Sequence, residues 1–245
     1  LVFIAIIRGK LRIPSSTIPQ VVLSSICACI LITLTYHAVD YLDVGLVMLI
    51  LYCFPLGVAF ISYFRGKSKI VFVQWLSMVV LMLGLYLMLS SGDQVLNLYG
   101  LFISFLGLLF FIAFIVTASD LSEQIGATTF NLYVSLLGII FLTVGFILPL
   151  GFEMDLPLTK TGIFAIFANG VFYISSWVLF FKGASIIGAT RSSMLACIEP
   201  LFAALLAIIL LKQILSVTEW IGFFIVLTAI YTFEKNSAKP EARST

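Results

Sequence analysis

Residues 190–211 read TRSSMLACIEPLFAALLAIILL, and every residue from Pro200 to Leu211 is apolar. A helix needs about 20 predominantly apolar residues to cross the hydrocarbon core of a bilayer. This segment therefore predicts a membrane-spanning helix. It places one carboxylate, that of Glu199, near the middle of the membrane, next to a proline.

Segments of the same kind fill the rest of the chain. Of 245 residues, 62% are hydrophobic and 10% are charged, whereas soluble domains have about 45–50% apolar and 25% charged residues. Too few polar side chains remain to cover a water-facing surface, so we expect an all-α, polytopic transmembrane helix bundle that contacts membrane lipid. Charges and turn signals delimit a stub at Leu1–Ile7 and seven further spans, at 19–37, 44–64, 70–90, 97–118, 128–151, 161–181 and 217–233.

Several classes of function lack the residues they need. The four cysteines lie inside apolar runs without a CxxC pair, and His37 is the single histidine, so we expect no metal site and no cofactor. There is no Walker A pattern for ATP hydrolysis. The net charge of +2 is too small to indicate a nucleic-acid partner.

The basic residues predict the orientation, because lysine and arginine are retained on the cytoplasmic side. With the loop after the stub placed inside, 11 of the 13 lysines and arginines are cytoplasmic, and Lys160 and Lys212 are outside. The tail 234–245 is then a cytoplasmic tail. Together with the span count, this predicts an integral protein of a bacterial cytoplasmic (inner) membrane.

The chain also contains an internal repeat. A shift of 145 residues places Pro55 on Pro200, and the same shift pairs Leu56 with Leu201, Ala59 with Ala204, Lys67 with Lys212, Gln74 with Glu219, Trp75 with Trp220 and Tyr86 with Tyr231. Matched aliphatic residues carry little weight in so apolar a chain, whereas a proline, a tryptophan and a lysine in one register indicate a repeat. Chance agreement is the alternative.

The register predicts how the spans are divided. The first repeat occupies 1–90 and the second 97–233. We call two residues paired by the shift mates, and the mate of residue 97 falls before Leu1. We therefore expect ten spans in two inverted halves of five, of which this chain lacks the first span and most of the second. Inverted repeats of this kind build many secondary transporters, with the substrate site between the halves.

Three short motifs resemble a known family: Gly188-Ala189-Thr190, then residues 199–205 (EPLFAAL), then Trp220-Ile221-Gly222. They are similar to the second half of an EamA-like domain of the drug/metabolite transporter superfamily. The resemblance implies ten spans in duplicated five-helix halves and the transport of small metabolites such as amino acids, nucleotide sugars or amines. The chain departs from the family in two places. Phe54 precedes Pro55 in the first half, and Lys212 lies where an acidic residue commonly ends the ninth span.

Glu199 is the first candidate for substrate binding. A carboxylate near the bilayer centre usually faces a cavity or a partner, which fits a proton site or a site for a substrate amine. The alternative is a structural carboxyl that hydrogen-bonds to backbone groups freed by Pro200.

Asn169, Tyr173 and Trp177 are the next candidates, because their i, i+4, i+8 spacing places them on one helix face. Aromatic rings with polar tips suit a cavity for a small amphipathic solute, and helix packing is the alternative. Tyr52, close to Pro55, could mirror the second-half site. Arg191 could contact an anionic group or extend to lipid headgroups.

Pro55 and Pro200 lie within spans, where a missing N–H bends the helix. Bends at repeat-related positions suit a rocking motion, or they shape a static bundle. We expect a secondary transporter, an exporter of small metabolites, working by alternating access and without enzymatic activity. The alternatives are a non-transporting structural or assembly subunit and an intramembrane enzyme, and a homodimer is left open.

Overall fold

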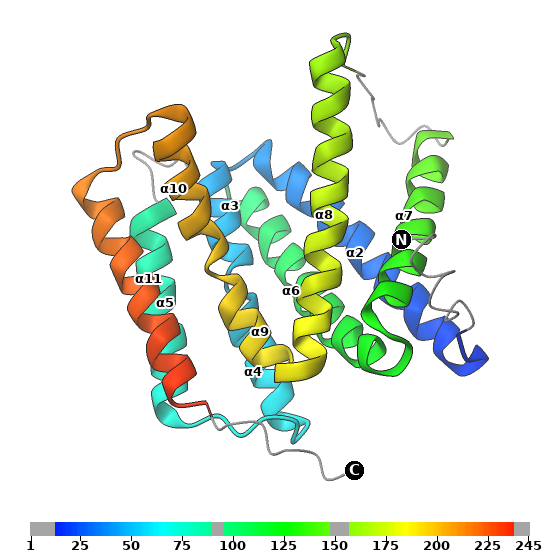
Figure 1. Ribbon diagram of the computed structural model, residues 1–245, viewed down its shortest axis with the longest axis horizontal. Coiled ribbons are helices and arrows are strands. Elements are labelled where there is room, and N and C mark those ends of the chain that lie inside the picture. The colour runs from blue at the N-terminus through cyan, green and yellow to red at the C-terminus, as the bar shows by residue number, and fades with distance from the viewer. Residues whose placement is uncertain (1–12, 90–95, 148–156, 238–245) are drawn as a thin grey trace. The chain divides into compact units, whose positions relative to one another are not determined.

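The computed structural model describes residues 13–89, 96–147 and 157–237, and these residues form helices and connecting turns without a strand. The elements shown in Figure 1 are η1 (Ser15–Thr17), α2 (Ile18–Val39), α3 (Val44–Leu51), α4 (Phe54–Phe64), α5 (Phe72–Leu89), α6 (Leu98–Ile125), α7 (Ala127–Ile147), α8 (Lys160–Ile187), α9 (Ala189–Ala196), α10 (Glu199–Leu211) and α11 (Val217–Lys235). Eight helical segments of these residues are long and apolar enough to cross a membrane. The all-α, polytopic prediction is confirmed, and the stub at Leu1–Ile7 lies outside the described residues.

The ends of two helices differ from the prediction. α6 continues to Ile125 and α8 to Ile187, beyond the predicted ends at 118 and 181. Polar residues such as Asp120 set the predicted end of α6, but a helix can continue with polar residues once it has left the membrane. Both helices end instead at a glycine with a positive φ, Gly126 with φ 86° and Gly188 with φ 89°, a conformation that residues with a Cβ rarely adopt.

The chain forms two compact units, and each unit combines segments from both predicted repeats. Unit 1 contains Leu1–Cys29 and Thr117–Ile186, and unit 2 contains Ile30–Val116 and Ile187–Thr245. In unit 1, the rings of Phe130 and Phe181 pack edge to face with centroids 5.5 Å apart. Unit 2 contains parts of α2 and α6 and the helices α3, α4, α5, α9, α10 and α11, which include the segments around both prolines.

Two spans of unit 2 are each broken into two helices. α3 ends before Tyr52 and α4 begins at Phe54; α9 ends before Cys197 and α10 begins at Glu199. The hydrogen bonds at the two breaks agree under the 145-residue shift: Cys53 N donates to Ile50 O, and Ile198 N donates to Leu195 O, both at 3.1 Å. The prolines at the second position of α4 and α10 cannot donate to the preceding helix, which explains why the chain breaks here.

Helices α5 and α11 pack closely, and they run antiparallel. Near the start of α5, Gln74 Nε2 donates to Oγ of Ser237, just beyond the end of α11. Near the other end of α5, Met88 lies beside Gly222, which is close to the start of α11. Gly222 also faces the backbone of α5, since a Cβ built on it would lie 2.6 Å from Gly84 O.

The two helices of this pair begin with the same polar contact. Gln74 Oε1 accepts from Val71 N at 3.0 Å, and Glu219 Oε2 accepts from Ser216 N at 2.6 Å. These residues are mates under the 145-residue shift. In α11 the contact is reciprocal, because Ser216 Oγ accepts from Glu219 N and completes a capping box.

Candidate functional site

The two broken spans of unit 2 meet and run in opposite directions. α4 packs on α9, while Met48 and Tyr52, at the end of α3, line one cavity together with residues of α10. Each half of one span therefore lies beside the opposite half of the other, as the ribbons in Figure 1 also show. Opposed directions are the arrangement expected of inverted repeats.

The cavity has a volume of about 330 Å³ and lies at the end of unit 2 where α5 and α10 finish and α11 begins; we call this the cavity end. This volume falls at the small end of the range for ligand pockets, about 300–1,000 Å³. The wall is mainly apolar, and its polar members are Tyr52, Gln213 and Glu219. The remaining lining residues are Met48, Met88, Leu89, Pro200, Ala203, Ala204, Ala207 and Leu215.

The geometry of the breaks brings three of the predicted residues together. The phenol of Tyr52 is close enough to the carboxyl of Glu199 for the two side chains to interact. Glu199 is the first residue of α10 and Pro200, which lines the cavity, is the second. The backbone N–H groups at the start of a helix favour a negative charge there. Glu199 is exposed on the surface of the unit, so it is not a carboxylate enclosed by apolar packing.

Glu219 and Gln213 are cavity residues that the sequence did not single out as a site. Glu219 faces the cavity and is oriented by its contact with the backbone N–H of Ser216. The one signal that could have found it is the pairing of Glu219 with Gln74 under the 145-residue shift, since a polar residue then recurs at the same position of both repeats.

Asn169, Tyr173 and Trp177 lie on α8, in unit 1. Asn169 is exposed, and Tyr173 is 50% exposed. Trp177 is half-buried and stacks on Phe181 with centroids 5.5 Å apart and planes inclined by 22°. Packing accounts for part of the Trp177 surface, while substrate binding by the three residues remains a prediction.

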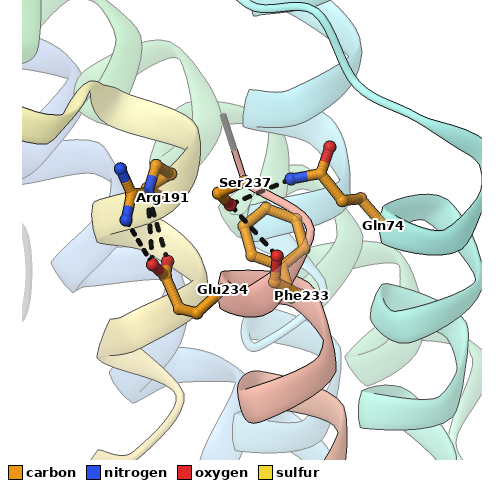
Figure 2. Close-up of polar contacts among 5 residues, drawn as sticks. All are labelled: Gln74, Arg191, Phe233, Glu234 and Ser237. Atoms are coloured by element: carbon orange, nitrogen blue, oxygen red, sulfur yellow. Dashed lines mark hydrogen bonds and ion pairs between the residues drawn. The ribbon is translucent and has the colours of Figure 1, made fainter. Parts of the chain in front are cut away.

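The Arg191 side chain contacts an acidic residue of the same unit. Its Nε lies 3.2 Å from Glu234 Oε2, and its Nη2 forms an ion pair with the same oxygen (Figure 2). The two side chains are 25% and 24% exposed. This pair joins the start of α9 to the end of α11, at the end of unit 2 opposite the cavity, which we call the ion-pair end.

Comparison with known proteins gives this arrangement a context. The model of the EamA-like transporter family matches residues 1–90 and 98–233. An uncharacterized inner membrane transporter of Salmonella typhimurium, YicL, is 34% identical over 61 residues, which are 25% of this chain and 20% of YicL. A protein of known crystal structure aligns with 99% of this chain and 84% of its own, with a TM-score of 0.77; at 13% identity this likeness shows the fold alone.

Proposed function

The chain belongs to the EamA-like transporter family, and from this premise we propose that it is a secondary transporter which exports small amphipathic metabolites, such as amino acids or amines, by alternating access. Membrane transport is the activity of the family. The class of solute, the direction of transport and the mechanism are the proposed part. Its partners are then a small-molecule metabolite and the surrounding lipid.

The observation that carries the proposal is the cavity of about 330 Å³ beside the two broken spans. Its apolar wall, which includes three alanines of α10, suits an aliphatic or aromatic group of the solute. The Glu219 carboxylate, and the Glu199 carboxylate beside Tyr52, suit an ammonium group, and the face of a tyrosine ring also attracts a cation. The apolar wall, the acidic Glu219 within it and the second carboxylate next to its Tyr52 together favour an amphipathic amine over an anion.

Alternating access is supported by the broken spans themselves. A helix interrupted at its middle can change direction there without losing the packing of both halves. The interruptions lie at repeat-related positions of two antiparallel spans, so the same local bend is available from either side of the membrane.

The proposed location is the bacterial inner membrane, with a cytoplasmic C-terminus. The name of the Salmonella relative supports this membrane, and the distribution of lysine and arginine supports the orientation. In this orientation the cavity end faces outward and the ion-pair end faces the cytoplasm.

The proposal is tested by metabolite export from cells that express the full-length protein. Glu199→Gln keeps the shape of the side chain and removes its charge, so export is expected to fall at equal protein level. Glu123→Gln, on an exposed carboxylate near the end of α6, is the matched control and should export normally. Wild-type cells that export no metabolite faster than cells without the protein would favour a non-transporting subunit.

A further inference from the structure

The 145-residue register relates each residue of the cavity to a mate at the opposite end of unit 2. Ala203, Ala204 and Ala207 of α10 correspond to Val58, Ala59 and Ser62 of α4. Met48 and Tyr52 correspond to Ser193 and Cys197 of α9, and Glu219 corresponds to Gln74 of α5. The mates therefore belong to α4, α9 and α5, which meet towards the ion-pair end.

These mates differ from the cavity residues in their exposure. Val58, Ala59, Ser193 and Cys197 are each 0% exposed, and Ser62 is 6% exposed. On the cavity side, Ala203 is exposed, and Ala204 and Ala207 are half-buried. One end of unit 2 is therefore open where the repeat-related end is packed shut.

The packed end buries polar groups that have no partner. Oγ of Ser193 and Oγ of Ser68, the mate of Gln213, are buried and form no hydrogen bond in the described part of the chain. A buried hydroxyl without a partner carries a desolvation cost, which is removed when water reaches it. The packed end thus has the hydroxyls expected of a surface that is hydrated in another state.

The Arg191–Glu234 ion pair holds this end together. It ties α9 to α11 two residues before Ser193 along α9, and Gln74 in turn contacts Ser237 (Figure 2). At the cavity end, the mates of Arg191 and Glu234 are Leu46 and Leu89, two apolar residues that cannot form an ion pair. The asymmetry in exposure therefore coincides with an asymmetry in the contacts that close each end.

We propose that unit 2 contains a second solute cavity, closed in this structure and lined by Val58, Ala59, Ser62, Gln74, Ser193 and Cys197, which opens at the ion-pair end when Arg191 and Glu234 separate. The proposal rests on the proposed transport function and takes the same class of solute. α9, the first helix of the broken span, moves away from α4, with the break at Cys197 as the hinge. The solute enters or leaves through one cavity at a time, passing Tyr52 and Glu199.

Cysteine labelling tests this in the full-length protein with its native cysteines replaced by serine. Ser62→Cys reports on the second cavity, and Ala207→Cys, its mate, reports on the first. The probe is a membrane-impermeant methanethiosulfonate carrying a trimethylammonium group, applied to intact cells and to inverted vesicles. With Arg191 intact, Ala207→Cys should react from one side only, and Ser62→Cys should be protected.

Arg191→Gln is then expected to raise the labelling rate of Ser62→Cys about tenfold, from the opposite side, and to lower that of Ala207→Cys, since the two open states compete for one population. Glu234→Gln breaks the same ion pair, is expected to change the two labelling rates in the same directions, and replaces Arg191→Gln if that variant is poorly expressed. The exchange Arg191→Glu with Glu234→Arg should restore protection. Lys235→Gln, which removes an exposed cation next to Glu234, should change neither rate.

Two results would overturn the inference. In the first, Ser62→Cys stays unreactive in every variant while Ala207→Cys reacts. That outcome leaves the first cavity standing and eliminates the second. A rise of both rates together in Arg191→Gln would show general loosening instead of exchange. Failure of Ala207→Cys to react at all is a different outcome, since it removes the first cavity and the transport proposal with it.

Discussion

Tyr52 and Cys197 end α3 and α9 with nearly the same backbone geometry, φ −67° and ψ −2° in one and φ −67° and ψ 1° in the other. The two residues are 145 positions apart, and the tyrosine side chain interacts with Glu199, two residues beyond the cysteine. The repeat, which the sequence shows as a few identical residues at a shift of 145, is therefore also a match in backbone conformation at the place where the two broken spans meet.

Tyr52→Phe is expected to reduce export about tenfold, which corresponds to the loss of an interaction with a charged group worth roughly 1.5 kcal/mol. The ring remains, so the cavity wall and the fold should be preserved. The measurement is the initial rate of export at equal protein level. Tyr63→Phe, on an exposed ring of α4, is the control. A rate equal to that of the wild type would remove the Tyr52 hydroxyl from the site.

Pro200→Ala restores a backbone N–H, which allows a hydrogen bond to the carbonyl of Ala196 across the break. Because a proline inside a helix costs about 3 kcal/mol, the variant should favour a continuous helix over residues 189–211. We expect melting in detergent at the wild-type temperature or above it, together with loss of export. Pro14→Ala, before the first described helix, should alter neither. Normal export by Pro200→Ala would show that the break is dispensable.

Gly222→Ala should destabilise the protein by about 1–3 kcal/mol, since its Cβ would lie 2.6 Å from Gly84 O and would push α11 away from α5. The measurement is denaturant unfolding in detergent micelles. Gly138→Ala is the comparison, because no atom lies within 4 Å of the position of its Cβ. It should be neutral or stabilising by up to about 1 kcal/mol, the difference in helix propensity. Equal effects at the two sites would contradict the close packing of α5 on α11.

A double-mutant cycle on Arg191 and Glu234 should give a coupling energy of about 1 kcal/mol, at the upper end for exposed pairs, because both side chains are about three-quarters buried. The cycle uses Arg191→Gln, Glu234→Gln and the double variant, each unfolded by denaturant at low salt. Added salt should reduce the coupling only in part, since partly buried pairs are weakly screened. A coupling of zero would mean that the contact adds nothing to stability.

The eight spans could be predicted because membrane length and apolar runs determine them locally. The positions of the breaks followed from Pro55 and Pro200, since proline acts on the preceding turn of its own helix. That each break separates two distinct helices did not follow, because it depends on how the freed backbone groups are bonded. The length of α8 was underestimated for a related reason: Gly188, and not the charge at Lys182, ends the helix.

The members of the site were harder to predict. Tyr52 was found from its closeness to Pro55 and Glu199 from its depth in the membrane, but nothing in the chain indicated that they interact, since they are 147 positions apart. Glu219 and Gln213 become cavity residues only through the turn between α10 and α11. The contact of Arg191 with Glu234 also joins residues far apart in sequence, and the sequence offered only a choice between an anion and lipid headgroups.

The backbone contact of Gly222 with Gly84 has a practical consequence for comparing conformations. Two helices that touch this closely have little space to slide past each other, so we expect α5 and α11 to move together. Superposing any future state of the protein on this pair alone would express the shifts of α3, α4, α9 and α10 in a common frame, free of the averaging that a fit over all helices introduces.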